Sequence, residues 1–588
     1  MNDPVLSGTI TNVNGPIVKA VGMRGVSMLD IAEVGPSRLV GEVIRLHDEV
    51  TIVQVYEDNT GLRPGDTVLS SGRPLSVLLG PGLISNIYDG IQRPLVGIEE
   101  RCGAYIRKGI KVSPLDTEKK WPLKVLAKKG DAVKPGTVVG EIQESPCILH
   151  RVMVPPGISG VIETIVPSGE YTIEDEIYRV ATSEGAVAGK LAHYWPVRQQ
   201  RPFLEKKRSG MPLITGQRII DTFFPIAKGG TAAIPGGFGT GKTMTQHALA
   251  KWCDADVIVY IGCGERGNEM TDVLNEFPGL VDPRSGRPLM ERTVMIANTS
   301  NMPVAAREVS IYTGVTIAEY YRDMGYSVAV MADSTSRWAE ALRELASRLG
   351  DMPAEEGFPP YLATRLAEFY ERAGYVETLN NREGSISIIG AVSPPGGDFS
   401  EPVTQHTTRF VRCFWALDKV LADARHYPSI SWTDSYTEYI DEIEKWWREK
   451  HGEWLDVRKE ALNILLEEDR LQQIVKLVGP DALPLEDRFI LFCAEIIKNG
   501  FLQQNSFDPK DMYCSPEKQI RLLGIIVRFY REGKEALAGG TDLHSLLFLD
   551  SVPEISRLKS EIGNDELERL EVFEKLLESQ LVSLRGVR

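Results

Sequence analysis

Residues 236–243 read GGFGTGKT, which fits the complete G-x-x-x-x-G-K-[ST] pattern of a phosphate-binding loop. A short apolar run precedes the loop and a helical pattern follows it, as in a strand–loop–helix unit. Glycines let the backbone turn tightly, so that its N–H groups can surround a polyphosphate. The helix that follows directs its positive end at the same anion. The chain is therefore predicted to bind a nucleoside triphosphate within an α/β fold.

The residues of this loop have distinct predicted roles. Lys242 can reach the outer phosphates as a point charge, and the hydroxyl of Thr243 can complete the coordination of Mg²⁺. A glycine-rich turn without a ligand is the alternative, and the strand and helix patterns on either side argue against it. The predicted phosphate-binding residues are Gly236, Gly237, Phe238, Gly239, Thr240, Gly241, Lys242 and Thr243.

Composition narrows the class of protein. At 588 residues the chain is too long for one hydrophobic core, and 43% hydrophobic with 25% charged residues is typical of a soluble globular protein. The sequence contains no run of 18 apolar residues, and its first residues lack a signal-peptide pattern, so we expect a cytosolic location. The net charge of −15 argues against a broad nucleic-acid surface, although a local basic groove stays open.

The first third of the chain reads as β structure. Alternating apolar and polar positions with Gly, Pro and Asp-Asn turns predict a small β-barrel over 1–75, followed by a connector at 76–111. Short Val/Ile strands predict a second, inserted β-rich domain over 112–188, similar in pattern to biotinyl and lipoyl carrier barrels. A carrier needs a lysine at a hairpin tip, and no lysine here has that context, so interaction or spacing is the predicted role.

The pattern of apolar and polar residues changes twice in the rest of the chain. Over 189–435, apolar strand-like runs alternate with helical segments, which predicts a parallel sheet covered by helices, with the phosphate loop inside it. Over 436–588, charged amphipathic segments predict a helical bundle. The fold class is therefore multidomain α/β, with a nucleotide-binding core between β-rich and helical parts.

Glu265 is the candidate for activating water. The run 256–262 has the composition of a buried strand, and Glu265 and Arg266 follow just beyond its carboxyl end. In a doubly wound sheet, ligands bind at that edge. A carboxylate there can orient and polarise the water that attacks the γ-phosphate. A simple charge pair at the start of a helix is an equally good interpretation of these two residues alone.

Asp333 ends a second apolar run, 326–333, as expected of a Walker B strand. Its carboxylate could hold Mg²⁺ opposite Thr243, directly or through water. An acid in this place can also cap the next helix, but the complete phosphate loop about ninety residues earlier favours the metal role. A third strand pattern, 385–392, leads into a Pro- and Gly-rich loop suited to a subunit contact or a γ-phosphate sensor.

Taken together, the motifs resemble one family. The sequence is similar over nearly its whole length to the catalytic A subunit of V-type and archaeal A-type rotary ATPases, and the β-rich segment 112–188 resembles the insertion that distinguishes this subunit from its relatives. One departure is Gly237, where many relatives have proline or alanine. The resemblance rests on PLITGQR at 212–218, the phosphate loop, GERGNE at 264–269, DSTSRWAE at 333–340 and SPPGGD at 393–398.

The resemblance implies a role for each matching residue. Lys242 would bind phosphate, Thr243 and Asp333 would hold Mg²⁺, Glu265 would activate water, and Arg266 would lie near the γ-phosphate. ATP or ADP would be the bound nucleotide.

The adenine base in this family lies against aromatic side chains that follow the sheet. Tyr427 and Phe507 stand at the similar positions of this sequence, and Gln504 lies beside Phe507 as a further nucleotide contact. Two aromatic faces can stack on a base, although each ring could equally belong to an ordinary core.

The resemblance also implies an assembly. Three copies would alternate with three non-catalytic B subunits, each supplying an arginine finger, and central and peripheral stalks would join them to a membrane ring. The chain itself would be peripheral, on the cytoplasmic side of the membrane, with no nucleic-acid partner. A hexameric RNA-stimulated motor and a flagellar or type III export ATPase are the alternative enzymes, and a regulatory, non-catalytic subunit is the alternative binding module.

Overall fold

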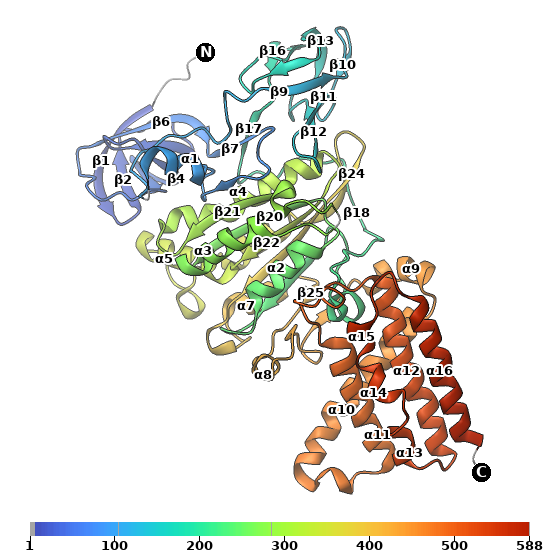
Figure 1. Ribbon diagram of the computed structural model, residues 1–588. Helices are drawn as coiled ribbons and strands as arrows, with labels where there is room; N and C mark the ends of the chain where they lie inside the picture. The colour runs from blue at the N-terminus through green and yellow to red at the C-terminus, as the bar shows by residue number, and fades with distance from the viewer. Residues whose placement is uncertain (1–5, 104, 284, 587–588) are drawn as a thin grey trace. The chain divides into compact units, whose positions relative to one another are not determined.

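The computed structural model describes residues 6–103, 105–283 and 285–586, and the ends of the predicted first and last domains, 1–5 and 587–588, lie outside them. The chain forms two compact units, each assembled from segments that are not contiguous in sequence (Figure 1). The first unit comprises Met1–Lys207, Gly229–Thr231 and Ala255–Val411, and the second comprises Arg208–Lys228, Ala232–Asp254 and Arg412–Arg588. The domain boundaries predicted from sequence stay a prediction.

A closed six-stranded barrel begins the first unit, in the order β1-β2-β5-β4-β3-β6. Its inward positions are apolar and fully buried, as with Val18, Val43 and Val53, because alternate residues of a strand face the same side. This confirms the predicted amino-terminal barrel. Its strands are β1 (Leu6–Asn14), β2 (Ile17–Val21), β3 (Asp30–Val34), β4 (Leu39–His47), β5 (Val50–Val55) and β6 (Thr67–Pro74).

The inserted β-rich segment consists of two four-stranded sheets, ordered β10-β13-β15-β16 and β12-β11-β9-β14. Trp121, Val139, Ile162 and Val180 are among its buried side chains, so this part has an apolar core of its own. Its strands are β9 (Trp121–Val125), β10 (Ala132–Val133), β11 (Val138–Gln143), β12 (Leu149–Met153), β13 (Gly160–Ile165), β14 (Gly169–Tyr171), β15 (Tyr178–Thr182) and β16 (Gly185–Gly189).

A parallel sheet forms the centre of the first unit, with neighbouring strands in the order β24-β22-β20-β21-β8. The central strands are apolar along their length because both faces are buried. The helix α4 packs against β20, β21 and β22, and almost all of its residues are buried. The bounds are β8 (Ile87–Tyr88), β20 (Val257–Glu265), β21 (Thr293–Thr299), β22 (Ser327–Asp333), β24 (Glu383–Val392), α3 (Gly267–Glu276), α4 (Val304–Asp323), α5 (Thr335–Leu349), α6 (Leu362–Tyr370) and α7 (Pro402–Thr408).

The predicted connector contributes elements that its sequence did not indicate. The two-residue strand β8 extends the central sheet, and β7 pairs with β17 in a separate two-stranded sheet. Strands this short cannot show a period in sequence. The remaining α-helix and β-strands of the first unit are α1 (Leu95–Cys102), β7 (Ser76–Leu79), β17 (His193–Pro196), β18 (Glu205–Lys207) and β23 (Gly374–Glu377).

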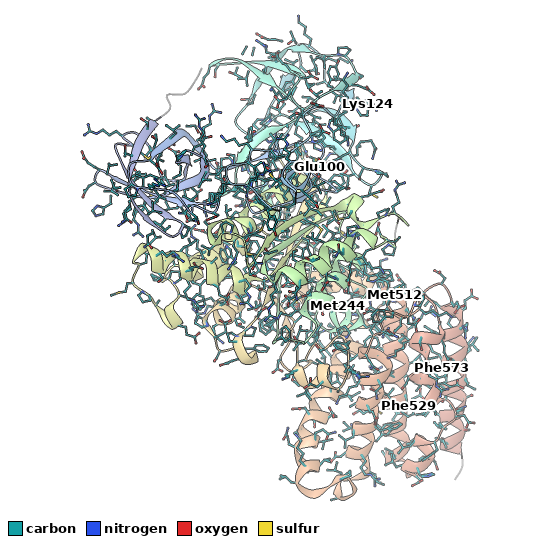
Figure 2. The ribbon with its side chains drawn as sticks, turned by 60° about the vertical axis from the view of Figure 1, so that its left-hand side comes forward. Glu100, Lys124, Met244, Met512, Phe529 and Phe573 are labelled. Atoms are coloured by element: carbon teal, nitrogen blue, oxygen red, sulfur yellow. The ribbon has the colours of Figure 1, made fainter. Side chains whose placement is uncertain are left out.

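The second unit contains the phosphate-loop helix and the carboxyl-terminal helices. The predicted helical bundle is confirmed: α10, α11 and α12 pack on one another and α16 packs on α12, with Phe529 and Phe573 buried among them (Figure 2). The elements are β19 (Thr231–Pro235), α2 (Lys242–Trp252), β25 (Cys413–Phe414), α8 (Lys419–Asp423), β26 (Tyr436–Thr437), α9 (Ile440–Lys450), α10 (Trp454–Val478), α11 (Leu485–Ile497), α12 (Pro516–Ala538), α13 (Leu543–Leu547), α14 (Val552–Ile555), α15 (Leu558–Glu561) and α16 (Glu568–Gly586).

Long helices in this unit are amphipathic rather than uniformly apolar. Across the described part of the chain, none of the helices combines the length and apolarity that crossing a bilayer requires.

A buried ion pair joins two distant parts of the second unit. The Nη1 atom of Arg218 lies 2.6 Å from Oδ1 of Asp511, and both side chains are at most 1% exposed. Arg218 also donates through Nη2 to the carbonyl of Gln503 at 2.8 Å, and its backbone N–H donates to Oε1 of Gln504 at 2.9 Å. Arg218 therefore anchors the chain around residues 503–511.

We predict that Arg218→Met destabilises the second unit, because it leaves the Asp511 carboxylate buried without its cation. Removal of one partner from a buried pair costs about 3–5 kcal/mol. Scanning calorimetry of the full chain should show a clearly lower unfolding midpoint.

The matched control is Arg24→Met, which breaks an ion pair whose side chains are 90% and 80% exposed. Exposed pairs contribute little, so its midpoint should equal that of the native chain. Equal midpoints for both variants would show that the buried pair does not hold the unit together.

Candidate functional site

The phosphate loop lies between a strand and a helix, as its sequence predicted. β19 ends at Pro235 and α2 begins at Lys242. Gly239 and Gly241 have φ values of 80° and 87°, in the left-handed region that favours glycine. Gly241 is the N-cap residue of α2, so the loop runs directly into the positive end of the helix.

Hydrogen bonds within the loop hold its backbone around the Lys242 ammonium. Nζ of Lys242 donates to the carbonyl of Gly236 at 2.8 Å, and Oγ1 of Thr240 donates to the carbonyl of Gly237 at the same distance. Ser429 supports the loop from outside, since its hydroxyl donates to the carbonyl of Thr240 at 2.6 Å. A phosphate oxygen that enters the loop can replace the Gly236 carbonyl as the acceptor for the ammonium.

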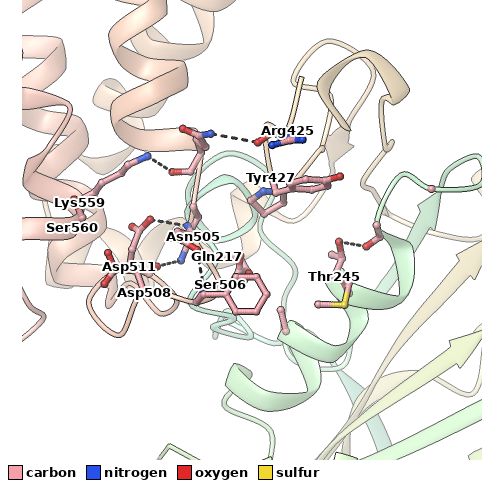
Figure 3. A pocket seen from close by; sticks show the side chains of 18 residues that line it. Gln217, Thr245, Arg425, Tyr427, Asn505, Ser506, Asp508, Asp511, Lys559 and Ser560 are labelled. Carbon is pink, nitrogen blue, oxygen red and sulfur yellow. Dashed lines mark hydrogen bonds between the residues drawn. The ribbon is translucent and has the colours of Figure 1, made fainter. Parts of the chain in front are cut away.

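Within the second unit, a cavity of about 1030 Å³ opens beside the loop (Figure 3). Its walls include Gly239 and Gly241 of the loop, Thr245 of α2, and the predicted base contacts Tyr427 and Phe507. A Cβ atom built on Gly241 would lie 3.5 Å from the Tyr427 ring, which places that ring close to the loop. The cavity is large enough for a nucleotide.

The two aromatic side chains are available to a ligand. Tyr427 is 42% exposed and Phe507 is 88% exposed, so neither ring is an ordinary core residue. Gln504 also lines the cavity, but its amide is already committed to the protein. Its Nε2 donates to the carbonyls of Gly216 and Asp511, each at 2.8 Å. Gln504 therefore stabilises the cavity wall, and its Nε2 atom is already engaged by the protein and not by the base.

Some cavity residues were missed by sequence reasoning. Arg425, Asp508, Lys559 and Ser560 line the same cavity. Lys559 and Ser560 belong to α15, a four-residue helix about three hundred residues beyond the loop. No local motif marks them, because only the fold of the second unit brings them to the cavity.

In the first unit, the two candidate acids end neighbouring strands of the parallel sheet. Glu265 is the last residue of β20, and Asp333 is the last residue of β22 and pairs in register with Gly262. The hydroxyl of Tyr260 lies 3.4 Å from Oδ2 of Asp333, which is 2% exposed. The N-cap residue of α5 is Ser334, one position beyond Asp333.

Electrostatics around Glu265 favour a proton or a cation. Burial, the Asp333 charge and the neighbouring Glu269 raise the pKa of Glu265 to about 8. A site where one carboxylate opposes the ionisation of another fits a divalent cation, which prefers oxygen ligands and relieves the repulsion between them. Arg266 follows Glu265 directly as the N-cap residue of α3, which begins at Gly267.

Comparison with known proteins identifies the family of this chain. Its C-terminal match is to the C-terminal domain of V and A type ATP synthase, at 444–546. It is 57% identical over 565 residues to the V-type ATP synthase alpha chain of Halothermothrix orenii, which covers 96% of each chain. The chain therefore belongs to the family of V and A type ATP synthases.

Other matches agree with this assignment. The chain is 54% identical to the A subunit of the A-type ATP synthase of Methanopyrus kandleri, over 98% of both chains. The confirmed family is that of the catalytic A or alpha subunits, whose members are ATP hydrolases and synthases. Models of the ATP synthase alpha/beta family match its beta-barrel domain at 10–72, barrel-sandwich domain at 112–198 and nucleotide-binding domain at 216–437.

A solved structure of the ATPase EscN, from the type III secretion system of enteropathogenic E. coli, shares the fold. The TM-score is 0.63 with 22% identity, over 88% of this chain and all of the other. At that identity the likeness shows the fold alone, and the near-full-length relatives place the chain in the V/A-type family instead of the export or RNA-stimulated enzymes.

We predict that the raised pKa of Glu265 makes the stability of the chain depend on pH. An ordinary glutamate in the unfolded chain has a pKa near 4.3, so unfolding releases a proton between pH ~4.3 and ~8. The stability that the protonated side chain contributes is present at low pH and is lost as the pH rises toward 8. Relative to Glu265→Gln, the native chain should therefore become progressively less stable from pH 5 to pH 8.

Urea denaturation of both proteins, without nucleotide or divalent cations, measures this difference. Glu276→Gln, at the exposed end of α3, is the control and should follow the native chain at every pH. A native-to-Glu265→Gln difference that stays constant with pH would contradict the raised pKa.

Proposed function

We propose that the chain hydrolyses or makes ATP in a membrane-attached rotary complex and couples that reaction to the transport of protons or sodium ions. The observation that carries this proposal is the phosphate loop, which opens within one compact unit onto a cavity walled by Tyr427 and Phe507. The family supports the coupling, since its relatives are named as subunits of V-type and A-type ATP synthases.

In the proposed reaction, the Lys242 ammonium binds the outer phosphates and the base lies between the two aromatic rings. Thr243 and Asp333 would hold Mg²⁺, whose charge, when bound, offsets that of the β- and γ-phosphates. The Glu265 carboxylate accepts a proton from the water that attacks the γ-phosphate, and ADP leaves in line with that attack. Arg266 adds positive charge near the transferred group.

The pKa of Glu265 suits this role. A general base works best when its pKa lies near the operating pH, and a value of about 8 meets that condition. A cation held by Asp333 favours the ionised carboxylate, so metal binding and activation of the base are linked through one electrostatic interaction.

We further propose the assembly in which this chemistry takes place. Three copies alternate with three non-catalytic B subunits, and each B subunit supplies an arginine finger to a neighbouring site. Central and peripheral stalks connect this ring to the membrane ring, with the chain on the cytoplasmic side. A finger supplied in trans raises the rate by roughly 10³ to 10⁵ in well-studied NTPases, so the isolated chain should hydrolyse ATP poorly.

We predict that two substitutions separate binding from turnover. Lys242→Ala removes the phosphate ligand and should weaken MgATP binding at least tenfold, whereas Glu265→Gln keeps the size of the side chain and should retain affinity while abolishing turnover. Calorimetric titration of the purified chain and hydrolysis assays of the reconstituted complex measure the two effects.

Each variant controls for the other. Unchanged MgATP binding by Lys242→Ala would overturn the loop assignment, and near-native turnover by Glu265→Gln would remove this residue from the mechanism. ATPase activity that RNA stimulates, and that co-expressed B subunit does not, would contradict the rotary proposal as a whole.

A further inference from the structure

The two aromatic walls of the nucleotide cavity are poorly held by their own packing. Phe507 is 88% exposed and Tyr427 is 42% exposed, so few side-chain contacts fix their rings. Their spacing must therefore depend on backbone anchors. One such anchor is direct, because the backbone N–H of Gln504 donates to the carbonyl of Tyr427 at 2.8 Å and ties the two walls together.

The Gln503 carbonyl, just before this anchor, accepts hydrogen bonds from two cations. Nζ of Lys559 donates to it at 2.7 Å, and Nη2 of Arg218 donates at 2.8 Å. Lys559 also donates to the carbonyl of Asn499 at 2.6 Å, so a single ammonium clamps both ends of the 499–503 segment. Charge-assisted bonds of this kind are about twice as strong as neutral ones.

From Gln503 the fixed backbone continues to the second aromatic wall. The N–H of Asn505 donates to Oδ2 of Asp511 at 2.7 Å, and Oδ1 of Asn505 accepts from the N–H of Phe507 at 3.0 Å. Figure 3 shows Lys559, Asn505 and Asp511 gathered on one side of the cavity and Tyr427 on the other. The clamp therefore lies at the start of the segment that carries Phe507.

We propose that Lys559 is a positioning residue for the nucleotide base. It holds the 499–503 segment, and through it both aromatic walls, at the spacing that a purine needs. The inference rests on the proposed nucleotide site and deepens it, since it gives α15 a part in base binding. α15 lies beyond residue 546, where the match to the C-terminal family domain ends.

The charges around Lys559 make this role sensitive to pH. Burial and the Arg218 charge lower the pKa of Lys559 to about 8, while Asp511 opposes the shift. His426 also interacts with Lys559, but burial lowers the pKa of this histidine to about 4, so it is neutral from pH 7 upward. Lys559 is therefore mostly charged at pH 7 and loses its charge as the pH rises through about 8.

The test compares a ligand that has a base with one that lacks it. Lys559→Met keeps the length of the side chain up to Cε and removes the ammonium. Calorimetric titration of the purified full chain, in Mg²⁺ buffer at pH 7, should show ADP binding about tenfold weaker and tripolyphosphate binding within twofold of native. Lys575→Met, at an exposed position of α16, is the control and should change neither affinity.

A pH series separates the charged clamp from a general packing role. We compare the ADP affinity of the native chain with that of Lys559→Met. Between pH 7 and pH 9.5, the ratio of these affinities should fall toward one, because the native lysine loses its charge. Tripolyphosphate titrations at each pH report the groups at the phosphate end, including Glu265. A ratio that does not change with pH would overturn the inference.

Three other outcomes are decisive. Equal losses of ADP and tripolyphosphate affinity in Lys559→Met, with a lower unfolding midpoint, would show a general structural role and overturn the inference. Phe507→Ala separates this failure from failure of the proposed site. If Phe507→Ala weakens ADP binding and Lys559→Met does not, only the role of Lys559 is wrong; if neither changes ADP binding, the base site itself is wrong.

Discussion

The second unit depends on one buried ion pair, Arg218 with Asp511, between residues 293 positions apart in the chain. In a low-dielectric interior neither charge is tolerated without the other, so each fixes the place of the other. The remaining donors of Arg218 then set the backbone that forms a wall of the nucleotide cavity. The hydrogen bonds and the ion pair of one guanidinium thus determine the geometry of the binding site. The exposed aromatic rings of that site make too few contacts to determine it themselves.

In the first unit, by contrast, charges of the same sign interact. Its parallel sheet is apolar along the central strands, and Glu265 and Asp333 lie at the strand ends, where the Asp333 charge opposes the ionisation of Glu265. Two opposite charges in contact stabilise each other, whereas two charges of the same sign favour the binding of a proton or a cation. The two charges of the same sign lie where chemistry is proposed, and the two opposite charges lie where a wall must hold its shape.

Sequence reasoning succeeded where the signal is local. The phosphate loop, the barrel, the inserted sheets and the helical bundle all have periods or motifs confined to short windows, and each was found. β8 was missed because a two-residue strand has no period, and Lys559 was missed because only the tertiary fold brings α15 to the cavity. Gln504 lines the cavity, but the sequence could not show that its amide donates to two backbone carbonyls of the protein.

The discontinuous second unit has a consequence for synthesis on the ribosome. β19 pairs through Ala232 and Ala233 with β25, at Cys413 and Phe414. At about 5–20 residues per second, the nascent chain carries this apolar strand for roughly 9 to 36 seconds before β25, its partner on one edge, is made. During that interval the strand has an open edge and an exposed apolar surface, which are the features that chaperones recognise. The order of the segments along the chain thus leaves one strand of the nucleotide-binding unit without this partner during part of translation.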